Sequence, residues 1–212
     1  MAQTRWEQAR SQERAAGQGG YGAHFARLIA EGVDVEGEAR LADALAPRGA
    51  WILDAGSGMG RVGAALVARG HHVVGVDFDP ELLDQSRRTF PDLAVVDSRL
   101  DELTPQTLSD AGFPTAYDVI VCVGNVMILL APDTERTVLG SLAALLAPEG
   151  RLVLGFNLSG APGGTSVEYP VDELVADCVS AGLEAEARFA SYDLRPFTDD
   201  SEYVVHVIRR RA

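Results

Sequence analysis

A strand, a glycine-rich turn and a helix follow one another between residues 50 and 69, and this segment constrains the fold most. Residues 50–53 are apolar enough for a buried strand that ends at Asp54, and residues 61–69 carry apolar side chains at helical spacing. The turn between them has three glycines at alternate positions: Gly56, Gly58 and Gly60. Glycine suits a turn whose backbone angles a Cβ opposes, and its bareness lets a ligand lie on the main chain. We expect a nucleotide-type cofactor there.

Strand-like and helix-like segments alternate after this first unit, which predicts a parallel sheet covered by helices on both faces. The expected strands are residues 72–76, 93–96, 117–123 and 151–156, and the expected helices begin at residues 80, with Asp79 as N-cap, and 133. A helix over 171–181 precedes strands over 183–192 and 202–210. Their connection is too short for a parallel crossover, so they form an antiparallel pair. Residues 155–170 are expected to form a loop over the carboxyl ends of the strands.

The glycines fit two overlapping cofactor patterns. Residues 58–63 satisfy G-x-G-x-x-G, the pattern of dinucleotide-binding turns. Residues 54–60 satisfy D-x-G-x-G-x-G, which resembles motif I of the class I S-adenosylmethionine-dependent methyltransferases. A carboxylate at Asp54 repels a pyrophosphate but suits the cationic amino acid end of S-adenosylmethionine, and the dinucleotide pattern begins too late after the strand. We therefore favour the methyltransferase register.

Polar side chains also follow the next strands, at the edge where ligands bind to open parallel sheets. Asp77 ends the second strand, 17 residues after Gly60, and its carboxylate can accept hydrogen bonds from both ribose hydroxyls. Phe78 can lie against the adenine ring. Asp97 can accept a bond from the adenine amino group, while the main chain at Ser98 serves a ring nitrogen. These positions match the methyltransferase pattern residue by residue.

The resemblance covers residues 51–156 and implies a fold, a cofactor and a reaction. The fold is α/β: a Rossmann-like, mostly parallel seven-stranded sheet with helices on both faces and a C-terminal antiparallel hairpin. The cofactor is S-adenosyl-L-methionine, and the expected cofactor-binding residues are Asp54, Ala55, Gly56, Ser57, Gly58, Gly60, Asp77, Phe78, Asp97, Ser98 and Gly124. The reaction is methyl transfer by in-line displacement. Two alternatives stay open, an NAD(P)-dependent oxidoreductase and a non-catalytic cofactor-binding module.

The cofactor carries the chemistry of methyl transfer, so the protein mainly orients the two partners and excludes water. We therefore expect no obligatory catalytic pair. Asn125 follows the fourth strand, where acceptor and methyl group meet, although capping of the next turn explains it equally well. Residues 20–29 are amphipathic and can fold across the cofactor, which makes Tyr21 and His24 further candidates. Only short insertions are available to build an acceptor pocket, which favours a small molecule.

Length and composition agree with one domain that works in the cytoplasm. At 212 residues the chain can form a single unit, with residues 1–48 as an N-terminal helical cap and 49–212 as the cofactor-binding core. A formal net charge of −13 argues against general affinity for nucleic acid. Two cysteines, the lack of a membrane-length apolar run and a polar N-terminus indicate the reduced cytosol. No spacing of His, Cys and Asp predicts a metal site.

Two further side chains have more than one interpretation. Arg61, in the first turn of the predicted helix, is as easily an exposed side chain as a ligand contact. His206 alternates with Val205 and Val207 and is expected to face solvent on a late strand.

Overall fold

A seven-stranded sheet forms the centre of the computed structural model, which describes residues 2–17, 20–160 and 165–211. The strands are β1 (Trp51–Ala55), β2 (His72–Asp77), β3 (Ala94–Asp97), β4 (Tyr117–Cys122), β5 (Leu146–Asn157), β6 (Leu183–Phe189) and β7 (Tyr203–Arg210). They lie in the order β3-β2-β1-β4-β5-β7-β6. The pairs from β3 to β5 are parallel, and β7 is antiparallel to both β5 and β6. The predicted fold class is confirmed.

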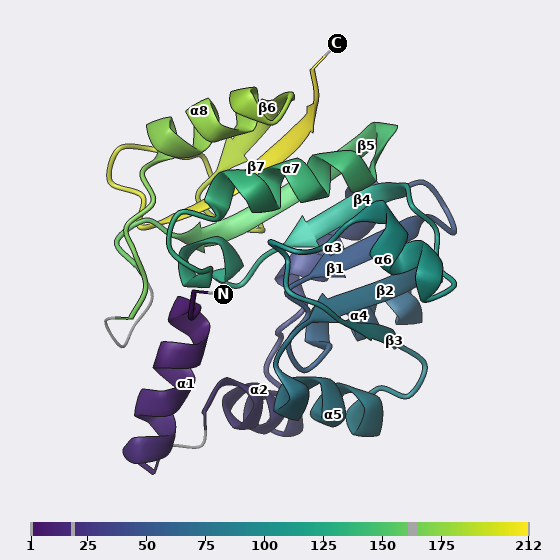
Figure 1. Cartoon of the computed structure of the whole chain (residues 1–212), viewed down its shortest axis with the longest axis vertical. Coiled ribbons are helices and arrows are strands. Elements are labelled where there is room, and N and C mark those ends of the chain that lie inside the picture. Colours follow the sequence, from purple (N-terminus) through teal and green to yellow (C-terminus); the bar gives the residue numbers. More distant parts are fainter. Residues whose placement is uncertain (1, 18–19, 161–164, 212) are drawn as a thin grey trace.

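Helices cover both faces of the sheet (Figure 1). The apolar side chains of α3 (Gly37–Leu45) and α4 (Arg61–Ala68) pack on one face, and those of α6 (Pro105–Asp110), α7 (Glu135–Leu145) and α8 (Val171–Ser180) pack on the other. Next to β3 lies α5 (Pro80–Thr89). The carboxylate of Asp79 accepts hydrogen bonds from the N–H groups of Glu81 and Leu82, so the predicted N-cap of α5 is confirmed.

Two N-terminal helices lie outside these layers. They are α1 (Arg5–Ala15) and α2 (Gly20–Ala30), which lie beside α5 in the lower part of Figure 1. The side chain of Thr4 caps α1 and forms a reciprocal capping box with Glu7. By contrast, α3 packs against α4 and belongs to a helical layer, although it lies within residues 1–48.

The connection between α7 and β5 differs from the expected one. A turn at residues 148–150 was expected before a strand over 151–156, but the structure extends β5 back to Leu146. The pairing with β4 shifts register inside this stretch, from Tyr117↔Leu146 to Val119↔Arg151. The turn-forming residues are therefore accommodated as an irregularity within the strand. Of the loop expected over 155–170, residues 155–157 belong to β5 and residues 161–164 lie outside the described residues.

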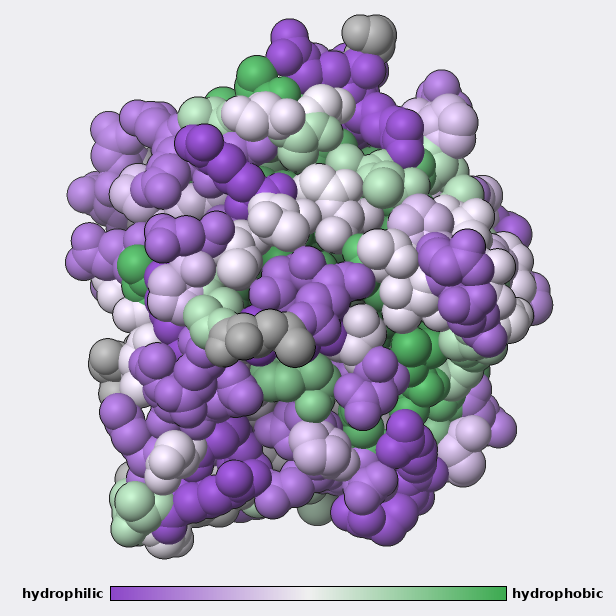
Figure 2. Space-filling view, in the orientation of Figure 1, coloured by the Kyte–Doolittle hydropathy of each residue, from purple (hydrophilic) through white to green (hydrophobic). Residues whose placement is uncertain are grey.

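The face of the molecule shown in Figure 2, which carries α7 and α8, is mostly hydrophilic, with apolar side chains in small separate patches. This agrees with the inward packing of the apolar side chains of α7 and α8. Within the described ranges, no helix is long and apolar enough to cross a membrane.

The expectation that His206 faces solvent is wrong, because its side chain is only 1% exposed. Its strand β7 pairs with β5 and β6 along its edges, and its side chains contribute to the packed core on each face of the sheet. Neither ring nitrogen has a hydrogen-bond partner within the described part of the chain. Burial, together with the nearby Arg188 cation, lowers the pKa of His206 to about 4.

This buried histidine predicts a loss of stability in acid. Between about pH 6.5 and pH 4 the unfolded chain protonates at His206 while the folded chain does not, so falling pH favours unfolding. We expect His206→Leu to abolish a pH-dependent loss of about 3 kcal/mol over this interval, measured by urea unfolding at a series of pH values. The exposed His72 supplies the control, since His72→Gln also removes one imidazole but leaves the buried one in place. If wild type and His206→Leu lose stability in parallel as the pH falls, the histidine is not buried as described.

Candidate cofactor and acceptor site

A cavity of about 740 Å³ lies at the carboxyl ends of the parallel strands, between the sheet and helices α1 and α2. Its walls come from the loops after β1, β2, β3 and β4, from α1, α2 and α3, and from β5, β7 and the segment before β7. The volume lies in the usual range for small-molecule sites, and the position is where ligands bind to such sheets.

The turn after β1 presents main-chain atoms without side chains to the cavity. Gly56 and Gly58 both line the cavity and have φ angles of 79° and 54°. A Cβ added at Gly56 would lie 2.5 Å from a methyl carbon of Val126, and one added at Gly58 would lie 3.3 Å from the Tyr21 ring. Side chains are therefore excluded here both by the backbone angles and by lack of space.

Asp77 lies at the end of β2, directly beside this bare backbone. One carboxylate oxygen accepts a hydrogen bond from Gly58 N at 2.8 Å, and the other accepts from Asp79 N at 2.9 Å. The residue lines the cavity and is 9% exposed, and burial raises the pKa of its carboxyl group. A carboxylate oxygen can accept more than one bond, so each keeps capacity for a donor on a ligand.

Several predicted contact residues lie behind the cavity wall. The carboxylate of Asp54 is 2% exposed and accepts a hydrogen bond from Gly63 N at 2.9 Å, which ties the end of β1 to the first turn of α4. Burial raises the pKa of Asp54 to about 7. The cavity lining includes neither Asp54 nor its neighbours Ala55, Ser57 and Gly60. These residues shape the turn from beneath, and direct contact between them and a ligand stays a prediction.

The wall after β3 also differs in part from the prediction. Phe78 and Ser98 line the cavity, whereas Asp97 is exposed and outside its lining. The guanidinium of Arg99 lies 5.7 Å from the centre of the Phe78 ring and pairs with Asp101 at 2.8 Å. Asp101 lines the cavity as well, so the structure places a different carboxylate on this wall from the one that the sequence pointed to.

A buried ion pair lines the cavity near α2 and α3. The guanidinium of Arg61 binds both carboxylate oxygens of Glu38, at 2.9 and 2.6 Å, and donates to the carbonyl of Val35. Arg61 is 6% exposed and lies 4.5 Å from the centre of the Phe25 ring, so the interpretation as an exposed side chain is wrong. Its Nε has no hydrogen-bond partner among the residues that the structure describes. Beside it, the Tyr21 hydroxyl faces this cation.

The wall after β4 is made of amides and phenols. Gly124 and Asn125 both line it and have left-handed backbone angles, with φ of 72° and 77°. The side-chain oxygen of Asn125 accepts hydrogen bonds from the N–H and the Nδ2 of Asn157, at 2.8 and 3.2 Å. Asn125 therefore holds the end of β5, and its side chain does not cap the following helix η1 (Val126–Leu129). The hydroxyls of Tyr192 and Tyr203 lie 2.8 Å apart on the same wall.

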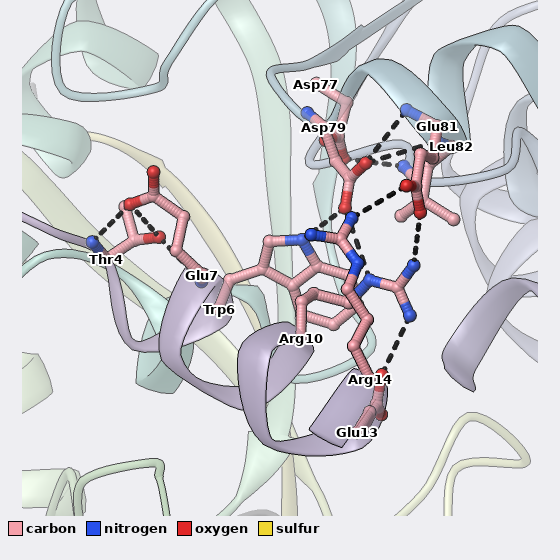
Figure 3. A network of polar contacts seen from close by, with 11 residues as sticks. Thr4, Trp6, Glu7, Arg10, Glu13, Arg14, Asp77, Asp79, Glu81 and Leu82 are labelled. Atoms are coloured by element: carbon pink, nitrogen blue, oxygen red, sulfur yellow. Dashed lines mark hydrogen bonds and ion pairs between the residues drawn. The ribbon is translucent and has the colours of Figure 1, made fainter. Parts of the chain in front are cut away.

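Polar contacts hold α1 over the cavity (Figure 3). The indole N–H of Trp6 donates to the carboxylate of Asp79 at 2.9 Å, and Arg10 pairs with Asp79 at 3.5 Å and with Glu81 at 2.8 Å. Since Asp79 N also donates to Asp77, the covering helix is bonded directly to the loop that carries Asp77. The expectation that N-terminal residues fold across the site agrees with Tyr21 and His24, both of which line the cavity.

Comparisons with known proteins agree with this geometry. A family model for a methyltransferase domain matches residues 53–152. The arsenite methyltransferase of Halobacterium salinarum is 29% identical over 201 residues, 87% of this chain and 49% of that protein. A ribosomal protein L11 methyltransferase of Marinobacter nauticus is 38% identical over 109 residues, 50% of this chain and 33% of that protein. The chain thus spans about half or less of the length of these curated relatives.

A solved structure matches over nearly the whole chain. It is a TehB-like S-adenosylmethionine-dependent methyltransferase from Corynebacterium glutamicum, with 37% sequence identity and a TM-score of 0.79, and the match covers 96% of this chain and 99% of that one. The chain belongs to the class I S-adenosylmethionine-dependent methyltransferases, and its cofactor is S-adenosylmethionine. The oxidoreductase alternative finds no support in these comparisons. In the described part of the chain, no cluster of His, Cys, Asp and Glu is arranged to hold a metal ion.

Proposed function

We propose that this methyltransferase acts on a small-molecule acceptor inside the cavity and that residues 1–48 and 49–212 work together as one catalytic unit. The observation that carries the proposal is that α1 and α2 line the same cavity as the ends of the strands. The wall after β4, where the acceptor would lie, meets α1 and α2, and polar contacts hold α1 in place. A cavity of about 740 Å³ has to hold the cofactor as well, which leaves room for a compact acceptor.

The residues present fit the cofactor. Gly56 and Gly58 offer bare backbone for the adenosyl part, and Asp77 offers carboxylate oxygens for the ribose hydroxyls. On our proposal, Phe78 and Ser98 flank the adenine, and Arg61, with its unpartnered Nε, receives the carboxylate of the methionine end. When bound, S-adenosylmethionine supplies an activated methyl group on a positively charged sulfur. The protein orients the acceptor toward that group and keeps water out.

The names of the relatives allow two kinds of acceptor. One relative is named for arsenite and the other for a ribosomal protein. The position of α1 favours the first kind, because a folded protein would have to insert a segment beneath this helix. We also propose that the enzyme works in the reducing cytoplasm, since Cys122 and Cys178 are both buried and unpaired.

Transfer of a labelled methyl group tests the kind of acceptor. The full chain is incubated with methyl-labelled S-adenosylmethionine and a bacterial extract, which is then separated into low-mass, protein and nucleic-acid fractions. We expect label in the low-mass fraction, with the amount falling when Asp77→Ala replaces the wild type. Label that enters the protein or nucleic-acid fraction instead would contradict a small-molecule acceptor.

A further inference from the structure

The wall after β4 carries side chains that can donate hydrogen bonds to a ligand. The side-chain oxygen of Asn125 accepts twice from Asn157, so the Nδ2 group is the part of this side chain that can donate to a ligand. Backbone donation by Asn157 N fixes this orientation of the amide, because a backbone N–H requires an oxygen opposite it.

The two phenols on this wall can also donate a hydrogen bond to a ligand. Tyr192 and Tyr203 share one hydrogen bond, and each phenol has one proton, so one proton of the pair remains for a ligand. The N–H of Gly124 also faces their oxygens. Burial raises the pKa of both hydroxyls, so they stay protonated and act as donors, not as bases.

The carboxylates that line the cavity all have donors within the protein. Each carboxylate has its own donors: Glu13 pairs with Arg10, Glu38 with Arg61, Asp101 with Arg99, and Asp77 accepts from two backbone N–H groups. His24 is exposed, and its Nδ1 lies 3.4 Å from Arg27. Within the described ranges, no lining carboxylate without a donor of its own lies beside the amides and phenols.

We propose that the acceptor of the small-molecule methyl transfer enters as an anionic nucleophile, such as a thiolate, whose lone pairs are held by Asn125, Tyr192 and Tyr203. This inference rests on the proposed function. The acceptor's lone pair forms the new bond to the methyl carbon, the bond from that carbon to sulfur breaks with its electron pair left on sulfur, and no proton moves. The negative charge of the acceptor and the positive charge on sulfur cancel in the transfer, and this loss of charge is favoured where water is excluded. A neutral amine, by contrast, brings N–H groups toward these donors.

Binding to the protein loaded with S-adenosylhomocysteine tests the inference without turnover. The probes are 4-nitrothiophenol, followed by the visible absorption of its thiolate, and 4-nitroaniline, a neutral amine of the same shape. We expect the thiolate to bind at least about tenfold more tightly than the aniline, and the bound thiol to titrate about one pH unit or more below the free thiol. No thiolate binding, or tighter binding of the aniline, would overturn the inference.

Variants separate this inference from the function on which it rests. Tyr203→Phe should remove most of the preference for thiolate, and its binding of S-adenosylhomocysteine, measured in parallel, shows whether the cofactor site is intact. Tyr117→Phe is the matched control, because Tyr117 is a buried tyrosine that does not line the cavity, and it should keep the preference. An equal loss in the Tyr117 variant would overturn the assignment. A wild-type protein that fails to bind S-adenosylhomocysteine would instead contradict the cofactor placement in the proposed function.

Discussion

Replacing Asp77 by alanine is expected to weaken the binding of S-adenosylhomocysteine by about 1–3 kcal/mol, or roughly 5- to 150-fold. The carboxylate lies in the cavity wall, and its oxygens accept from Gly58 N and Asp79 N. Ribose hydroxyls that lose this partner are left against a buried wall, where an unmade hydrogen bond is costly. Calorimetric titration of the wild type and the variant measures the difference.

Two comparisons make this result specific. Asp77→Asn keeps one acceptor oxygen and should lose less affinity than Asp77→Ala. Asp84 lies exposed on α5, paired with Arg87 and away from the cavity lining, so Asp84→Ala should bind as the wild type does. Since Asp77 also holds Gly58 and Asp79, thermal unfolding is needed to establish that each variant is folded. Unchanged affinity in a folded Asp77→Ala protein would place the ribose elsewhere.

Replacing Arg61 by methionine is expected to destabilise the fold by about 3–5 kcal/mol, the largest stability effect of a single substitution that we predict. The methionine fills much of the space but removes the cation from Glu38, whose side chain is 12% exposed. An unpaired carboxylate then remains in a wall where burial disfavours charge. Urea unfolding followed by circular dichroism gives the change in the free energy of unfolding.

The double variant Arg61→Met/Glu38→Leu distinguishes a buried pair from general loss of packing. It removes both charges, so it should recover most of the stability lost in the single variant. Its affinity for S-adenosylhomocysteine should stay low if Arg61 binds the methionine carboxylate. A single variant within about 1 kcal/mol of the wild type would mean that the pair is solvated, as exposed ion pairs are.

The fold and the floor of the site follow from local sequence patterns. A glycine-rich turn between an apolar strand and a helix needs no distant contact to be recognised, and Asp77 stands at the position that the pattern specifies. The C-terminal hairpin was predictable from the length of one connection. The sequence pattern predicts an exposed His206 because alternation with valines indicates a half-exposed strand. In the structure β7 lies in the interior of the sheet and is covered on both faces.

The remaining walls depend on tertiary contacts that no local pattern encodes. Glu38 and Arg61 lie on separate helices and meet only because α3 packs against α4. Tyr192 and Tyr203 reach the site from the segment before β7 and from its first residue. Asp97 is the expected adenine contact because it ends a strand, but the chain after β3 turns so that Asp101, and not Asp97, lines the cavity. In each case the missing information is how a connecting segment packs.

A crystal structure of the full chain with S-adenosylhomocysteine tests the central claim most directly. We predict that both ribose hydroxyls lie within hydrogen-bond distance of the Asp77 carboxylate, that the adenosyl part rests on Gly56 and Gly58, and that the sulfur faces Gly124. A ligand bound away from β2, with Asp77 still bonded only to Gly58 and Asp79, would contradict it.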